Sequence, residues 1–184
     1  MAADRLGEAL EWGSGTRLVE VFLEPTCPFS VKAFNKLAAF VEQAGSHKVC
    51  VRIWLHSQPW HMYSGVITRA ILAASTLENG KQQALQLLTA VGAHREKFEF
   101  EDHATGPNRD ATPNDILDRL VAVSGVDMRQ AFDEPALEKL VKRHTRYARQ
   151  NGIHVSPTFM VDGLVDASIG SGDSVAEWIE KVGL

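Results

Sequence analysis

The feature that most constrains the fold is an apolar strand, a helix and a second apolar strand that follow one another near the start of the chain. Residues 17–23, RLVEVFL, are β-branched and apolar, which is typical of a short buried strand. Residues 28–45 have apolar side chains at helical spacing, and residues 47–56, HKVCVRIWLH, again indicate a strand. This order predicts a βαβ unit with two parallel strands.

The start of the predicted helix places a cysteine at a position that can alter its chemistry. Pro28 suits the first helical turn, because its missing N–H would have no partner there. Cys27 then lies at or next to the helix N-cap, and Gly45 ends the helix. The residues expected on the buried face are Phe29, Ala33, Leu37 and Phe40.

The middle of the chain differs in character, because residues 60–150 have helical patterns throughout. Two helices are predicted on either side of residue 80, and a third begins with Thr112 as its N-cap. Pro135 is expected to start a fresh helix, which Gly152 ends. This region therefore predicts an all-helical block.

Strand character returns near the end of the chain. Residues 156–168, SPTFMVDGLVDAS, contain two short apolar runs joined at Asp162-Gly163, which suits a tight hairpin turn. Residues 172–183 then predict an amphipathic helix capped by Asp173 or Ser174. The fold class expected from this order of elements is α/β.

Charge and hydropathy exclude two classes of partner. The chain of 184 residues has a formal net charge of −4, which provides no attraction to nucleic acid. No apolar run approaches the roughly 18 to 20 residues of a membrane span, so no membrane partner is expected. The N-terminal segment has no apolar core of signal-peptide length. We therefore expect a cytoplasmic protein, or a periplasmic one had a leader been removed.

Two motifs carry a resemblance to a known family. Residues 21–30, VFLEPTCPFS, and residues 151–163, NGIHVSPTFMVDG, occur in this order with the helical block between them, and residues 168–182 add a weaker likeness. From about Arg17 onward the chain resembles the thioredoxin superfamily. Within it, the likeness is to the branch with a helical insertion typified by DsbA-like thiol:disulfide oxidoreductases and protein-disulfide isomerases.

The resemblance implies a thioredoxin-like domain and an insertion. Residues 1–59 and 151–184 would form the thioredoxin-like domain, and residues 60–150 the inserted helical subdomain. It also implies that the Ser156–Pro157 bond is cis and lies beside the nucleophile, where the backbone can pair with an extended peptide or with glutathione.

Cys27 is the candidate nucleophile. A thiolate is the attacking species, and the unpaired N–H groups of a helix N-terminus lower a thiol's pKa. Ser30, one turn onward, can donate its hydroxyl or its N–H to the same sulfur. We therefore expect an accessible cysteine of low pKa, with Cys27 and Ser30 as catalytic residues. The expected substrate-binding residues are Pro28, Phe29, Ser156, Pro157 and Thr158, and the Ser156 hydroxyl is expected to tune the sulfur.

Ser30 stands where a second cysteine would complete the dithiol pair of the family. A mixed disulfide on Cys27 must then be resolved by an external thiol such as glutathione, which favours isomerisation or glutathione-dependent reduction over dithiol oxidation. Cys50 is the second of two cysteines, and its apolar strand predicts a core position with no catalytic role. A disulfide-containing protein or glutathione is the expected partner, and the chain leaves a homodimer open.

Other polar residues are weaker candidates. His56 and His61 flank Pro59-Trp60, but their spacing fits no compact metal site, so a structural role is favoured and no metal is expected. Glu99, Glu101 and Asp102 form an acidic loop without a paired-carboxylate context. Thioredoxins have a buried acid six residues before the cysteine. Val21 occupies that position here, and we transfer the role to neither Glu20 nor Glu24.

Two functional alternatives remain open. Kappa-class glutathione transferases and 2-hydroxychromene-2-carboxylate isomerases share the helical insertion and place serine where Cys27 stands. A peptide-binding module that has kept the groove but lost turnover is the other alternative. No cofactor is expected, and glutathione would act as a co-substrate. The leading interpretation is a DsbA-like thiol:disulfide oxidoreductase or isomerase that works through one cysteine.

Overall fold

The structure is a computed structural model that describes residues 7, 9–102 and 105–184. Within these residues five strands form one sheet in the order β1-β3-β2-β4-β5. The strands are β1 (Glu11–Gly13), β2 (Arg17–Leu23), β3 (Val49–Leu55), β4 (Thr158–Val161) and β5 (Leu164–Val165). The helices are α1 (Pro28–Ala44), α2 (Ser64–Ala74), α3 (Gly80–Ala93), the 3₁₀ helix η1 (Arg95–Lys97), α4 (Pro113–Ser124), α5 (Arg129–Asp133), α6 (Leu137–Gln150) and α7 (Val175–Lys181). The expected compartment was inferred from the N-terminal segment. That segment includes residues 1–6 and 8, which lie outside the described residues.

The predicted βαβ unit is confirmed. Strands β2 and β3 are parallel, and Leu23 at the end of β2 lies opposite Leu55 at the end of β3. Helix α1 returns between them, with Cys27 as its N-cap and Gly45 as its C-cap. Both strands therefore end at one edge of the sheet, where α1 begins.

The prediction of the buried helix face is wrong for one residue. Ala33, Leu37 and Phe40 are buried as expected, whereas Phe29 is 62% exposed. Phe29 lies in the first turn of α1, next to the edge where β2 and β3 have already ended, so the sheet does not cover its side chain.

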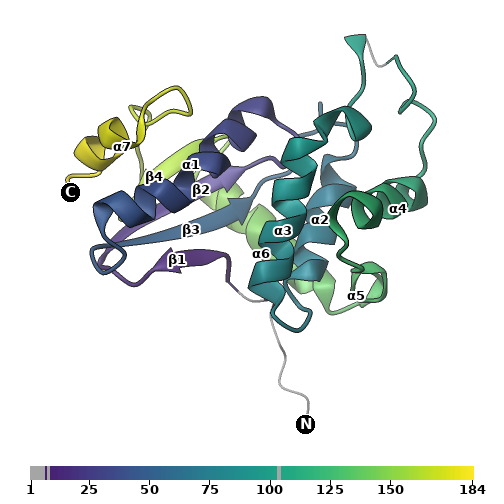
Figure 1. Ribbon diagram of the computed structural model, residues 1–184, viewed down its shortest axis with the longest axis horizontal. Coiled ribbons are helices and arrows are strands. Elements are labelled where there is room, and N and C mark those ends of the chain that lie inside the picture. The colour runs from purple at the N-terminus through teal and green to yellow at the C-terminus, as the bar shows by residue number, and fades with distance from the viewer. Residues whose placement is uncertain (1–6, 8, 103–104) are drawn as a thin grey trace.

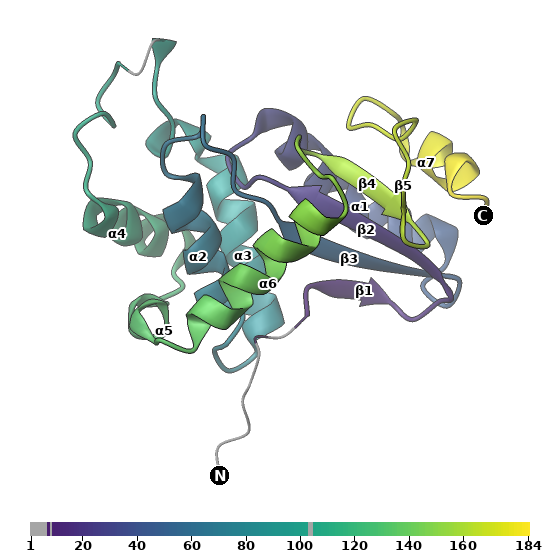
Figure 2. The ribbon, with the colours of Figure 1, turned by 180° about the vertical axis from the view of Figure 1, so that it is seen from behind.

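Helices cover both faces of the sheet. Helices α1 and α7 pack together on one face, and α6 crosses the other face over β3 (Figures 1 and 2). Beside the sheet, α2 packs against α3, α4, α5 and α6. One apolar core runs from the α1 face of the sheet into these helices, and a smaller cluster beneath α6 contains Phe22, Trp54 and Met160.

The helix boundaries of the middle region follow the local signals. Asn79 has a positive φ of 53° between α2 and α3, so the predicted break near residue 80 is confirmed. Thr112 and Asp115 form a reciprocal capping box at the start of α4. Pro135 lies in the turn before α6, which begins two residues later than predicted at Leu137.

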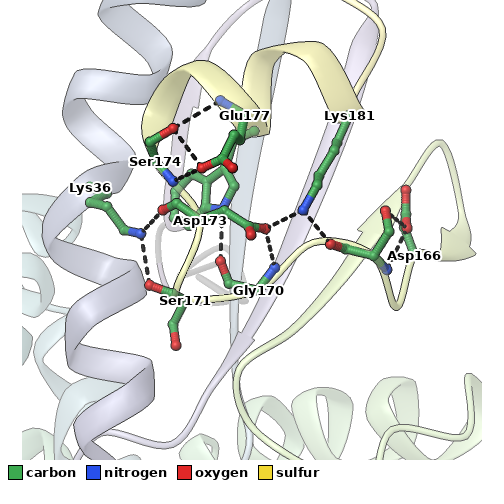
Figure 3. A network of polar contacts seen from close by, with 10 residues as sticks. Lys36, Asp166, Gly170, Ser171, Asp173, Ser174, Glu177 and Lys181 are labelled. Carbon is green, nitrogen blue, oxygen red and sulfur yellow. Dashed lines mark hydrogen bonds and ion pairs between the residues drawn. The ribbon is translucent and has the colours of Figure 1, made fainter.

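The C-terminal hairpin and helix are confirmed. Asp162 and Gly163 have φ angles of 49° and 86°, as a tight turn between β4 and β5 requires. Of the two predicted caps, Ser174 caps α7. Lys36 of α1 donates to the carbonyl of Ser171 at 2.8 Å and lies over the Trp178 ring. These contacts hold the segment before α7 against α1 (Figure 3).

Strand β1 is absent from the prediction. It has three residues and pairs antiparallel with β3 at the edge of the sheet. A run this short has no periodicity that can distinguish a strand from a loop.

Candidate functional site

The pairing of β2 brings two distant segments together at the edge where α1 begins. Phe22 of β2 lies opposite Thr158 of β4, so Ser156 and Pro157 fall just beyond the end of β2. The Ser156–Pro157 peptide bond is cis, as the resemblance implies. The Cys27 thiol donates a hydrogen bond to the Ser156 carbonyl at 3.5 Å. Ser156 thus contacts the sulfur through this carbonyl and not, as was expected, through its hydroxyl.

The environment of Cys27 favours its thiolate. Burial raises the pKa of the thiol, but hydrogen bonds from His61, from the backbone N–H groups of Ser30 and Phe29, and from the Ser30 hydroxyl outweigh burial and lower it from 9.0 to about 7. The N–H groups belong to the first turn of α1, where they have no helical partner. Cys27 is only 6% exposed, so the expectation of an accessible thiol is wrong.

His61, for which the sequence favoured a structural role, is the strongest side-chain partner of the thiol in the structure. Its hydrogen bond with Cys27 raises the pKa of His61 against the effect of burial, and the Glu24 carboxylate adds to this rise. His61 Nδ1 lies 3.0 Å from Thr26 Oγ1 and 3.6 Å from Glu24 Oε2. The predicted pairing of β2 and β3 could have indicated this placement. Cys27 follows β2 and His61 follows β3, and the segments that follow two paired parallel strands lie at the same edge of the sheet.

Glu24 is a second residue that sequence reasoning set aside. It is fully buried, and its Oε2 accepts hydrogen bonds from the N–H of Thr26 at 2.8 Å and from its hydroxyl at 2.9 Å. Burial raises the pKa of Glu24, and His61 opposes that rise. Within the described part of the chain, Glu24 Oε1 has no hydrogen-bond partner. The acid of this site thus lies three residues before Cys27, while Val21 is part of the core.

Thr26 connects these two groups and sets the tautomer of His61. A hydroxyl has one proton, and Thr26 gives it to Glu24. Thr26 Oγ1 must then accept from His61, so His61 Nδ1 carries a proton. The result is a continuous path of hydrogen bonds from Glu24 through Thr26 to His61.

Ser30 is buried, and its hydroxyl accepts a hydrogen bond from the N–H of Glu24 at 3.2 Å. The same hydroxyl also acts on the Cys27 sulfur. Ser30 therefore joins the first turn of α1 to the end of β2 and to the thiol.

Exposed apolar side chains stand next to the residues that contact the sulfur. Phe29, Trp60, Met62 and Val155 are each at least 62% exposed. Each is within two residues of a residue that contacts the thiol. Among the other predicted substrate-binding residues, Pro28 is exposed and Ser156, Pro157 and Thr158 are half-buried. The Thr158 hydroxyl donates to the Val155 carbonyl at 2.7 Å.

Cys50 lies away from this site, and its predicted core position is wrong. It is half-buried because β3 alternates, so Cys50 shares a sheet face with Arg52. Burial and the nearby Glu11 carboxylate raise the pKa of its thiol. Cys50 precedes Leu55, at the site edge, by five residues, or about 17 Å along the strand. It is therefore too far from Cys27 to resolve a disulfide there.

The remaining polar candidates form no second site among the described residues. His56 is half-buried with a pKa lowered by burial, and His154 and Arg149 are the charged groups that add to this effect. Over the described ranges no three His, Cys, Asp or Glu side chains cluster as metal ligands would. No helix in the same ranges has the length and apolar character needed to cross a membrane.

No family model and no curated protein matches the chain. A solved structure from Pseudomonas syringae, described as "a putative protein-disulfide isomerase", is 62% identical with a TM-score of 0.93, covering 96% of this chain and 98% of its own. The Wolbachia pipientis thiol-disulfide exchange protein α-DsbA2 is 18% identical with a TM-score of 0.67, covering 94% and 84%. A Novosphingobium aromaticivorans protein-disulfide isomerase is 13% identical with a TM-score of 0.69, covering 97% and 100%.

The two distant structures have the same fold as this chain, which confirms the predicted α/β class with a helical insertion. The Pseudomonas protein is similar over nearly its whole length and at high identity, so the two proteins are members of one family. The chain belongs to the same family as this Pseudomonas protein, described as a protein-disulfide isomerase, and it has the DsbA-like fold of the more distant structures.

Proposed function

We propose that this protein exchanges thiols and disulfides in other proteins through one nucleophile, Cys27, as an isomerase or a glutathione-dependent reductase. The observation that carries the proposal is the Cys27 thiol at the N-terminus of α1, whose pKa is about 7 because His61 and helix N–H groups stabilise its thiolate. Near neutral pH about half of such a thiol is the attacking species.

In the first step the Cys27 thiolate attacks one sulfur of a substrate disulfide. That disulfide bond breaks, a mixed disulfide forms between Cys27 and the substrate, and the second substrate sulfur leaves as a thiolate. The His61 imidazolium lies beside the reacting sulfur and can donate the proton that the leaving thiolate takes up. The Ser156 carbonyl lies beside Cys27, where an extended substrate segment can pair with the backbone.

The second step needs another thiol, because Ser30 cannot attack the mixed disulfide. A thiolate of the substrate itself can displace Cys27, which moves the disulfide and leaves the number of disulfides unchanged. Alternatively, one glutathione thiolate releases the substrate thiol, and a second glutathione releases Cys27 as oxidised glutathione forms. The two glutathione thiols then supply the two electrons that reduce the substrate disulfide. This scheme fits a glutathione-containing compartment such as the cytoplasm and uses no bound cofactor.

Glu24 and Thr26 position His61 in this scheme. The hydrogen-bonded path keeps a proton on Nδ1 and the ring against the sulfur, and the buried carboxylate favours the imidazolium. The imidazolium in turn favours the Cys27 thiolate.

The test is to incubate the reduced protein with oxidised glutathione and to locate the adduct by mass measurement of peptides. We expect one glutathione on Cys27 and none on Cys50, and release of the adduct by added reduced glutathione. Cys27→Ser should form no adduct and should not reactivate a ribonuclease with scrambled disulfides, while Cys50→Ser should behave as wild type. An adduct confined to Cys50, or ribonuclease activity that persists in Cys27→Ser, would contradict the proposal. Conjugation of glutathione to an electrophile by Cys27→Ser would instead support the transferase alternative.

A further inference from the structure

A cleft of about 360 Å³ opens beside His61. Trp60 and Met62 line it together with residues 98–101, which follow η1. Sites that bind small ligands begin at about 300 Å³, so this cleft has room for one long side chain.

The cleft is joined directly to the reacting sulfur. His61 lines the cleft and also contacts the Cys27 thiol. Arg95, another lining residue, donates from Nε to the Thr26 carbonyl at 2.7 Å, one residue before Cys27. A side chain in the cleft would therefore belong to a substrate segment whose disulfide is at Cys27.

The charge in the cleft is unbalanced. Arg95 is paired with Glu99 at 2.6 Å, and its Nε is used on Thr26. The exposed Glu101 carboxylate has no ion-pair partner among the residues described. Arg95 and Glu99 neutralise each other, and the His61 imidazolium is balanced by the Cys27 thiolate that it contacts, so Glu101 remains as one unpaired negative charge on the cleft. The cleft thus presents a carboxylate to an incoming cation.

The remaining walls suit the stem of a basic side chain. Trp60 is 66% exposed and Met62 is 62% exposed, and Phe100 also lines the cleft. Lysine and arginine place an apolar stem against such surfaces while keeping the charged end in water. An aromatic ring also attracts a cation over its face.

We propose that this cleft binds a lysine or arginine side chain of the protein substrate, close in sequence to the cysteine that Cys27 attacks. The inference rests on the proposed function and names its preferred substrate class as basic segments that carry a disulfide. Glutathione, which has a net negative charge, would gain nothing from Glu101.

The test uses two short peptides that differ only in one residue beside a single cysteine, lysine in one and glutamate in the other. Each peptide is supplied as its mixed disulfide with thionitrobenzoate, and the release of coloured thionitrobenzoate by Cys27 is followed. Rates are divided by those of N-acetylcysteine with the same peptides, which removes their intrinsic difference in reactivity. The variants are Glu101→Gln, Glu101→Lys and, as a matched control outside the cleft, Glu96→Gln, whose side chain is 70% exposed.

Wild type should prefer the lysine peptide by about 2- to 5-fold, the range of an exposed ion pair. High salt and Glu101→Gln should remove this preference, Glu101→Lys should reverse it, and Glu96→Gln should retain it. Equal corrected rates in wild type, or a preference unchanged in both Glu101 variants, would overturn the inference while leaving the proposed function intact. If no peptide reacted at Cys27, the proposed function would fail, and the inference with it.

Discussion

Replacing His61 with phenylalanine should raise the pKa of Cys27, because it removes the largest contribution that stabilises the thiolate. Both wild type and His61→Phe are best studied with Cys50 replaced by serine, so that Cys27 is the single thiol. The pKa of Cys27 lies about 2 units below its ordinary value of 9.0. At 1.36 kcal/mol for each unit, the thiolate gains about 2.7 kcal/mol relative to the thiol.

The loss of that whole gain sets an upper limit on the effect. At pH 7 the thiolate fraction would fall from about one half to about 1%, a factor of about 50. A thiolate of higher pKa is intrinsically more nucleophilic, by about 6- to 10-fold for 2 units. The rate of alkylation at pH 7 should therefore fall by at most about 5- to 8-fold, and by less where the Ser30 and Phe29 N–H groups still contribute.

The assay is the rate of reaction with iodoacetamide from pH 5 to pH 10. Above pH 9, where both thiols are ionised, the variant should react faster than wild type, so the two rate profiles should cross. A misfolded or blocked site would be slower at every pH. His56→Phe, on the same segment but outside the site, should keep the wild-type profile. A wild-type midpoint near 9.0, or a midpoint unmoved by His61→Phe, would refute the reasoning.

Four further outcomes follow from the structure. The folded-state pKa of Cys27, about 7, lies below its ordinary value of 9.0, so its stabilisation is complete above pH 9 and is lost as the pH falls through 7. Urea unfolding should therefore show wild type gaining about 2 kcal/mol over Cys27→Ser between pH 7 and pH 9. Ser30→Cys should resolve the glutathione adduct internally and speed insulin reduction, and a persistent adduct would contradict this. His144→Leu leaves the N–H of Leu55 without its acceptor at 3.0 Å, and should cost about 1–3 kcal/mol of unfolding free energy without moving the alkylation midpoint. Trp178→Ala empties a site packed against Phe40, and should cost about 3–5 kcal/mol in the same measurement.

Elements with strong local signals could be predicted from the sequence. The apolar run of β2, the Asp162-Gly163 turn and the Thr112 cap each follow from a few adjacent residues. Cys27 as the N-cap of α1 belongs to the same class, because Pro28 marks the first helical turn on its own.

The partners of the sulfur could not be predicted in this way. His61 lies in an irregular segment after β3, and its distance from Cys27 depends on strand register and on the route of the loop. Glu24 follows the last residue of β2, so neither strand periodicity nor the family's acid position identifies it. Its importance comes from burial beside Thr26 and His61, and burial is a tertiary property.

The structure gives Ser30 a role that the sequence motif does not indicate. As a letter in the motif it marks a missing second thiol, whereas in the fold its hydroxyl holds the backbone of Glu24 and stabilises the Cys27 thiolate. Protein covers nearly all of Cys27, and the exposed residues next to it are Pro28 and Phe29. We infer that the thiol that resolves the mixed disulfide must enter through the opening that the substrate itself occupies. A small thiol such as glutathione, or a second thiol already present on the bound substrate, meets this steric condition better than a separate folded protein does.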